Sequence, residues 1–166
     1  MIVLIGFMGA GKTTVGALLA EYLLIPFIDS DEVIEASEGL AVREIFATKG
    51  EAEFRRIEAA TITRLLAGPD VVLALGGGAL TTLDVRAALV GHQVVLLDVA
   101  FEEALERVAA DPGRPMLHQP DLSGLYDRRQ DDYREAARKA VPVSGRSPRE
   151  VVEDVLAALG MNGVGE

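Results

Sequence analysis

The sequence contains no cysteine and no tryptophan, and only three of its 16 basic residues are lysines. Without cysteine the chain can form no disulfide and no thiolate nucleophile, which fits a reducing compartment. It has no apolar run approaching the roughly 18 residues that cross a bilayer. The opening MIVLIGF is short and lacks the basic leader of a secretory signal. We therefore expect a cytoplasmic protein that does not enter a membrane.

Net positive charge is lacking too. The formal charge of −10 disfavours general attraction to nucleic acid or to anionic membranes. With 49% hydrophobic residues the chain is not a disordered polyelectrolyte, and 166 residues suffice for one domain with a real core. No internal repeat and no long linker divides it. We expect a single domain over residues 1–166 that acts as a monomer.

Apolar segments alternate with helical patterns along the chain. Strands are expected at 2–5, 25–28, 70–75, 93–98 and 140–143. Helices are expected up to Leu23, over most of 31–67 with breaks at Gly39 and Gly50, and at 82–89, 101–110, 125–139 and 148–159. This alternation predicts an α/β fold with a central parallel five-stranded sheet flanked by helices in three layers. Glu102, Glu103 and Glu106 are interpreted as the solvated face of a helix.

Residues 111–124 contain three prolines and two glycines and are expected to be irregular. So long a loop in a small domain suits a lid over an active site. A plain surface loop is the alternative. Residues 160–166 are expected to be a frayed tail.

The segment GFMGAGKT at residues 6–13 matches the phosphate-binding pattern G-x-x-x-x-G-K-[ST], with a strand before it and a helix after it. Its glycines let backbone N–H groups turn towards phosphate oxygens, and the helix N-terminus adds its dipole. Lys12 can reach the β- and γ-phosphates, and the Thr13 hydroxyl can ligate Mg²⁺. We therefore expect ATP as co-substrate, with Mg²⁺. The predicted cradle comprises Gly9, Ala10, Gly11, Lys12, Thr13 and Thr14.

Two aspartates follow the second expected strand, in PFIDSDEV. Ligands of doubly wound sheets gather at the carboxyl ends of the strands, so Asp29 and Asp31 should face the same crevice as Lys12. The competing interpretation is that Ser30 or Asp31 simply caps the following helix. The segment alone leaves both open.

The helix expected at 51–66 places Glu51, Arg55 and Glu58 on one face. The two carboxylates can fix the guanidinium for an anionic ligand, but a solvated ion-pair ladder has the same pattern. The run Gly76-Gly77-Gly78 ends the third strand. It either lets a ligand approach the backbone closely or forms a loose turn.

Taken together, the sequence resembles the shikimate kinase family. The resemblance rests on GFMGAGKTTVG, FIDSDEVIE, GEAEFRRIE, ALGGGA and the Arg-Pro of 111–124, in that order over nearly the whole chain. It implies a P-loop kinase with a nucleoside-monophosphate-kinase-like fold that phosphorylates the 3-hydroxyl of shikimate. It further implies a helical substrate-binding region at about 31–62 and a lid at about 111–124. A gluconate kinase-like enzyme and a non-catalytic nucleotide sensor are the alternatives.

The resemblance also assigns roles to residues. Asp31 would hold the acceptor hydroxyl and take its proton, Lys12 and Arg114 would neutralise the transferred phosphoryl group, and Asp29 would support Mg²⁺ beside Thr13. The acceptor pocket would comprise Asp31, Phe46, Phe54, Arg55, Gly76, Gly77, Gly78 and Arg129, and the adenine site Arg107, Arg146 and Pro148.

One segment departs from the family pattern. RRQDDY lacks the proline that the family usually carries between its carboxylate-binding arginine and Tyr133. The choice between Arg129 and Arg128 is therefore open. Asp131 and Asp132 add negative charge near the expected carboxylate contact.

Overall fold

The computed structural model describes residues 1–109 and 120–161. Within them, one sheet contains five parallel strands in the order β2-β3-β1-β4-β5. These are β1 (Ile2–Ile5), β2 (Phe27–Asp29), β3 (Val72–Ala74), β4 (Gln93–Asp98) and β5 (Lys139–Pro142). The central strands are continuously apolar because helices cover both faces of the sheet.

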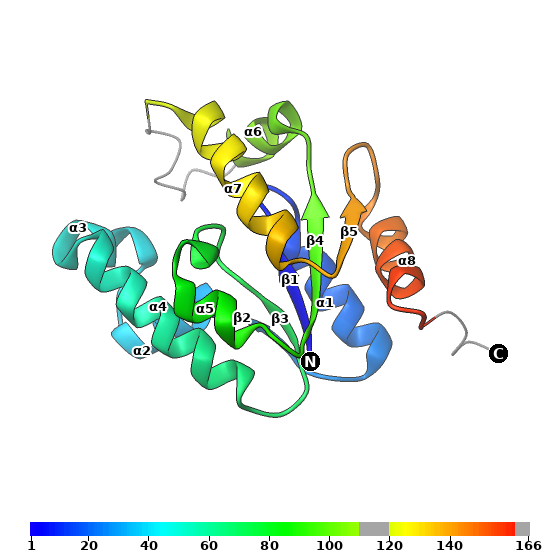
Figure 1. The fold of residues 1–166 in the computed structure, drawn as a ribbon, viewed down its shortest axis with the longest axis horizontal. Helices are drawn as coiled ribbons and strands as arrows, with labels where there is room; N and C mark the ends of the chain where they lie inside the picture. The colour runs from blue at the N-terminus through cyan, green and yellow to red at the C-terminus, as the bar shows by residue number, and fades with distance from the viewer. Residues whose placement is uncertain (110–119, 162–166) are drawn as a thin grey trace.

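The helices form the two outer layers. They are α1 (Lys12–Leu23), α2 (Ser30–Glu38), α3 (Val42–Lys49), α4 (Glu51–Leu66), α5 (Leu83–Ala88), α6 (Phe101–Ala109), α7 (Leu122–Ala136) and α8 (Pro148–Ala158), with a 3₁₀ turn, η1 (Ala79–Thr81). In Figure 1, α5 and α7 lie in front of the strands and α1 behind them, and α2, α3 and α4 gather at one end. The predicted three-layer α/β fold is confirmed.

Several predicted boundaries were wrong by a few residues, for local reasons. Ile25 does not start β2, because its N–H bonds to Ala20 and helps to close α1. Helix α7 begins at Leu122, three residues before the predicted start, because the Asp121 side chain accepts a hydrogen bond from Gly124 N–H as an N-cap. The irregular segment predicted for 111–124 therefore ends before Leu122.

Two predicted features fall largely outside the described residues. Most of the lid, with Arg114, lies in 110–119, and most of the tail lies in 162–166. Gly160 and Met161 still hydrogen-bond to the end of α8.

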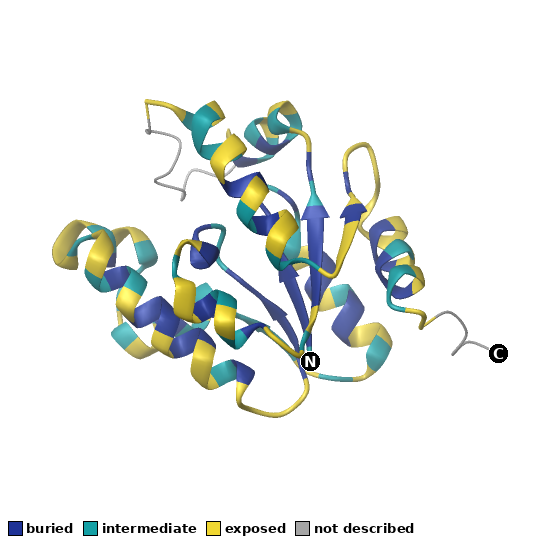
Figure 2. Ribbon diagram, viewed as in Figure 1, coloured by how far each residue is buried: buried dark blue, intermediate teal, exposed yellow. Residues whose placement is uncertain are grey.

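Two apolar clusters underlie the fold. The larger one joins the sheet to the helices on both faces, and Figure 2 shows the central strands β1, β3 and β4 largely in the colour of buried residues. A smaller one consists of Ile34, Ile45, Phe54 and Ile57, which come from α2, α3 and α4. These three helices cover the predicted substrate-binding region and thus have their own small core.

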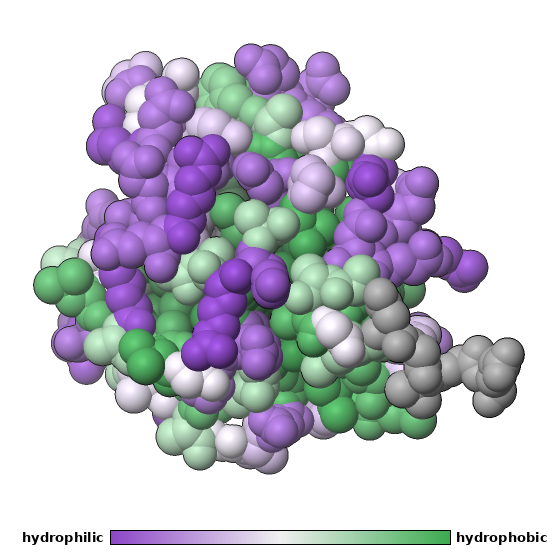
Figure 3. Space-filling model, turned by 45° about the vertical axis from the view of Figure 1, so that its right-hand side comes forward, coloured by the Kyte–Doolittle hydropathy of each residue, from purple (hydrophilic) through white to green (hydrophobic). Residues whose placement is uncertain are grey.

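The surface is mixed in hydropathy. In Figure 3, hydrophilic residues cluster towards the top and the left of the face shown, and apolar ones lie lower down. In the described ranges, no helix combines the length and the hydrophobicity of a membrane span.

Candidate active site

Two adjoining pockets lie at the carboxyl ends of the strands. The larger, of about 880 Å³, is lined by the phosphate-binding loop, α2, α4, the glycine run and α7. The smaller, of about 310 Å³, shares Gly11, Thr14 and Arg107 with it. Every predicted site residue that the structure describes lines one pocket or the other. Arg114 lies outside the described residues.

The phosphate-binding loop depends on glycine at specific points. Gly9 and Gly11 have φ values of 77° and 87°, in the left-handed region that favours glycine. A Cβ on Gly9 would also lie 2.6 Å from the Ala104 carbonyl oxygen. Lys12 Nζ donates to the carbonyl oxygens of Gly6 and Phe7 at 2.7 and 3.1 Å. The ammonium group thus lies across the loop, where phosphates would bind.

Asp29 joins the loop to α2. Its Oδ2 accepts a hydrogen bond from Thr13 Oγ1 at 2.8 Å, and its Oδ1 accepts one from Asp31 N–H at 3.0 Å. Asp29 is therefore the N-cap of α2, so the alternative interpretation, with Ser30 or Asp31 as the cap, does not hold. The Asp31 side chain lines the larger pocket.

The Thr13 and Asp29 pair suits Mg²⁺ by its chemistry. Both groups offer oxygen ligands beside the start of α1, and Mg²⁺ prefers one or two protein oxygens completed by water and phosphate. No cluster of three acidic, histidine or cysteine side chains that could hold a metal ion occurs in the part of the chain that the structure describes.

The glycine run makes room for three site side chains. A Cβ on Gly76 would lie 2.8 Å from Asp31 Oδ1, and one on Gly78 would lie 2.2 Å from Arg55 Nη2. Above Gly77, Arg129 Nη1 and the Tyr133 hydroxyl would lie 3.5 and 3.7 Å from such a Cβ, which is ordinary contact. The run is therefore a floor on which charged side chains lie, rather than a loose turn.

Ser30 fixes this floor to α2. Its side chain is fully buried, and its Oγ accepts a hydrogen bond from Gly76 N–H at 3.1 Å. The Gly76 N–H therefore holds the glycine run against α2.

Arg55 is held from several sides. Its Nη1 donates to Glu58 Oε2 at 2.6 Å, and its Nε lies 3.6 Å from Glu51 Oε1. Its Cζ lies 5.7 and 5.3 Å from the ring centroids of Phe46 and Phe54. The Arg55 side chain is only 15% exposed, so the solvated-ladder interpretation does not apply.

Glu58 is the most buried charged side chain of this cluster, at 1% exposure. Burial raises the pKa of its carboxyl to about 7, the nearby Asp31 adds to the rise, and Arg55 opposes it. Loss of either partner would leave a charged group buried without compensation, which makes the pair costly to break.

The structure distinguishes Arg129 from Arg128. Arg129 is 6% exposed and lines the larger pocket, with its Cζ 5.9 Å from the centroid of the Phe7 ring. Arg128 is 66% exposed and pairs with Asp121 at 3.4 Å. Desolvation lowers the pKa of the Arg129 guanidinium, although Tyr133 opposes this. Of these two arginines, only Arg129 is placed to contact a ligand in the larger pocket.

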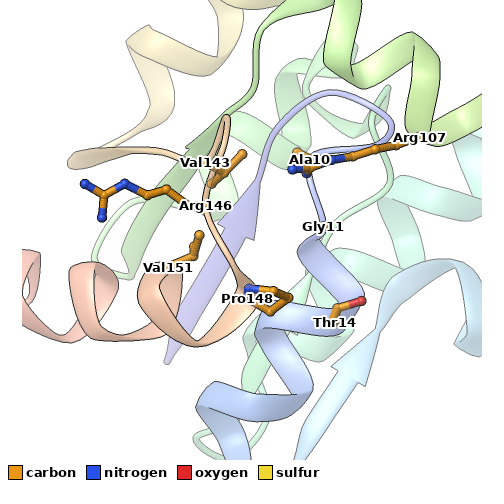
Figure 4. Close-up of a pocket in the computed structure, with 8 residues that line it drawn as sticks. All are labelled: Ala10, Gly11, Thr14, Arg107, Val143, Arg146, Pro148 and Val151. Atoms are coloured by element: carbon orange, nitrogen blue, oxygen red, sulfur yellow. The ribbon is translucent and has the colours of Figure 1, made fainter.

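The smaller pocket is shown in Figure 4, in which Arg107 reaches across Ala10 and Gly11. Arg107 donates to the Gly9 carbonyl oxygen at 3.1 Å and pairs with Glu103. Arg146 points away from the pocket, where it pairs with Asp154. The described pocket thus presents Arg107 and the apolar side chains of Val143, Pro148 and Val151.

Glu103 was wrongly interpreted as merely solvated. It is half-buried, pairs with Arg107, and accepts a hydrogen bond from Gly145 N–H at 3.2 Å. Desolvation opposes the shift, but hydrogen bonds from Ser144 and Gly145 and the charge of Arg107 hold its pKa below the usual range. Sequence reasoning also missed the contacts of Ser30 and Tyr133. Glu103 alone carried a local signal, its i, i+4 spacing from Arg107.

Comparisons with known proteins agree with this geometry. A model of the family described as shikimate kinase matches residues 8–160. A shikimate kinase of Streptomyces avermitilis is 44% identical over 161 residues, which cover 95% of this chain and 94% of that protein.

Solved structures also indicate similarity to shikimate kinases. The shikimate kinase of Acinetobacter baumannii, in complex with shikimate, superimposes with a TM-score of 0.92 and 36% identity, covering 99% of this chain and 94% of that one. A gluconokinase of Sinorhizobium meliloti is more distant, with a TM-score of 0.62 and 25% identity over 96% and 90% of the two chains. The chain therefore belongs to the shikimate kinase family.

Proposed function

We propose that the protein transfers the γ-phosphoryl group of ATP to the 3-hydroxyl of shikimate, giving shikimate 3-phosphate and ADP. One observation carries the proposal: Asp31, Arg55 and Arg129 meet around the glycine run in the same cavity as Lys12 and Thr13. The cavity thus combines a phosphate cradle with an acceptor site that has a base and two arginines.

The nucleotide binds across the start of α1. Its adenine occupies the smaller pocket under Arg107, and its phosphates lie along the loop towards Lys12. To bind them, Lys12 exchanges its bonds to Gly6 and Phe7 for bonds to phosphate oxygens. Arg114 remains a predicted second cation from the lid.

Thr13, supported by Asp29, would hold Mg²⁺. When bound, the ion would supply charge neutralisation at the phosphate oxygens. Asp29 keeps its link to Asp31 N–H meanwhile, so the same residue fixes the start of the helix that carries the base.

Shikimate is bound through its carboxylate and reacts through its 3-hydroxyl group. Arg55 and Arg129 bind the carboxylate through charge-assisted hydrogen bonds, and the rings of Phe46 and Phe54 wall the pocket. The 3-hydroxyl oxygen attacks the γ-phosphorus as the bond to the β-γ bridging oxygen breaks. Asp31 accepts the hydroxyl proton, and ADP leaves.

The two arginines favour shikimate over other acceptors. A gluconate kinase-like activity and a nucleotide sensor share the cradle, but neither explains why two arginines, Arg129 buried and Arg55 only 15% exposed, lie in the pocket with Asp31. The test is ADP release with shikimate, with gluconate and with no acceptor. We expect release with shikimate alone. Stimulation by gluconate alone, or by neither acceptor, would overturn the proposal.

The proposal includes a cytoplasmic monomer that uses neither nucleic acid nor membrane as a partner. A cytoplasmic location supplies the ATP that the reaction consumes. Sedimentation at micromolar concentration with ATP and shikimate tests the monomer, and a concentration-dependent dimer would contradict it.

A further inference from the structure

Helix α7, which carries Arg129, packs on the core through Tyr133 and, in part, through Leu125, Tyr126 and Ala136. Its buried residues are Arg129, Gln130 and Tyr133, all with polar groups. Apolar burial is non-directional, whereas hydrogen bonds and ion pairs define a register. The placement of α7 over the glycine run therefore depends strongly on its polar contacts.

Two of these contacts reach the glycine run or the turn that follows it. The Tyr133 hydroxyl donates to the Gly77 carbonyl oxygen. Arg86 of α5 makes the other contact: its Nε donates to the Leu80 carbonyl oxygen in η1, and its Nη2 lies 2.6 Å from Asp132 Oδ1. One guanidinium thus joins the turn after Gly78 to the residue before Tyr133.

Arg129 has no carboxylate of its own to hold it. Among the described residues none lies within ion-pair distance of its guanidinium, and its buried Nε has no hydrogen-bond partner. Arg55, in contrast, is held by Glu51 and Glu58. Its side chain instead contacts Tyr133 of the same helix, by a hydrogen bond, and the Phe7 ring, so the position of Arg129 over Gly77 follows that of α7.

We infer that Arg86, through Asp132, is a positioning residue for the acceptor site, because it holds α7 against the glycine run and so keeps Arg129 over Gly77. Asp132, which the sequence suggested as a source of repulsion, is instead neutralised by Arg86. The inference rests on the proposed role of Arg129 in carboxylate binding.

The test measures KM for shikimate and for ATP separately in Arg86→Gln and Asp132→Asn. We expect each to raise KM for shikimate about three- to tenfold with little change in KM for ATP. Arg134→Gln, on the exposed face of α7, and Glu135→Gln, whose carboxylate is 79% exposed and 3.5 Å from Arg86, should leave both values near wild type. Equal rises in both KM values, or a lower melting temperature with normal KM values, would mean a purely structural contact and overturn the inference.

A second variant, Arg129→Met, tests the proposed role of Arg129 in carboxylate binding separately from the role of Arg86. If Arg86 acts through Arg129, then Arg86→Gln should have no further effect on KM for shikimate in the Arg129→Met background. A rise with Arg129→Met but none with Arg86→Gln overturns the inference and leaves the proposed role of Arg129 standing. No rise with Arg129→Met removes that role and the inference with it. A full, additive effect in the double variant shows that Arg86 acts by another route and also overturns the inference.

Discussion

The nucleotide end and the acceptor end of the site are built in different ways. At the nucleotide end, the phosphate-binding part is one contiguous segment, residues 6–13, which supplies backbone groups, glycine conformations and a lysine, although the adenine pocket beside it also uses Arg107 and residues 143–151. At the acceptor end, side chains come from α2, α3, α4 and α7 and surround the glycine run. The first depends on local geometry, and the second on the packing of distant elements.

The two ends also treat charge differently. Glu103, beside the adenine pocket, is partly solvated and its pKa is lowered. Glu58, beside the acceptor, is buried and its pKa is raised. A substitution at the acceptor end should therefore have larger effects than the same substitution at the nucleotide end.

The largest expected effect is that of Asp31→Asn. The amide keeps the size of the side chain but cannot take the hydroxyl proton, so kcat should fall by a factor of about 10² or more. ATP affinity, measured by calorimetry, should stay near wild type, because Asp31 lies over Gly76 and not in the loop. If kcat survives, Asp31 only orients the hydroxyl.

A second variant tests the floor of the acceptor pocket. In Gly78→Ala the new methyl group would overlap the Arg55 guanidinium, 2.2 Å from Nη2, while the backbone at φ −102° accepts alanine. Because the displaced group is the end of a flexible side chain, we expect the variant to fold and its KM for shikimate to be about tenfold higher, as for loss of one charge-assisted bond.

Gly77→Ala is the matched control, since its methyl group meets only ordinary contacts from 3.5 Å. It should change KM for shikimate much less. Equal effects of the two alanines would show that the floor does not position Arg55.

The difference between the two ends also explains why the sequence predicts the phosphate-binding loop but not the contacts of the acceptor site. The loop is recognisable because its glycines, Lys12 and Thr13 are adjacent in the chain. The i, i+3 spacing of Arg55 and Glu58 indicates their ion pair but not its burial, which depends on the packing of α4. The bonds from Ser30 to Gly76 and from Tyr133 to Gly77 join residues 46 and 56 positions apart. No local pattern encodes such partners.

The charge of Glu58 should appear in the pH dependence of stability. Its pKa is about 7 in the folded protein and near 4.5 in the unfolded chain, so between these values the folded state binds more protons. This group therefore makes the free energy of unfolding fall as pH rises from about 4.5 to 7.

Urea titrations of the wild type and of Glu58→Gln between pH 5 and 8 test this. The stability of the wild type relative to the variant should decrease as pH rises through that window. Glu53→Gln is the control, because that exposed carboxyl has a lowered pKa and should give no such decrease. A pH-independent difference for Glu58→Gln would contradict a raised pKa.

The smallest effect is expected at the nucleotide end, from Glu103→Gln. The variant loses the charge that holds Arg107 and Gly145, but this carboxylate is partly solvated, so its ion pair contributes modestly. We expect KM for ATP to rise about two- to fivefold, with KM for shikimate unchanged. Glu106→Gln, at an exposed position of α6, is the matched control and should alter neither value. A rise tenfold or larger would mean that the adenine pocket relies on a side-chain clamp as the acceptor pocket does, and the contrast between the two ends would then hold only for the phosphate-binding loop.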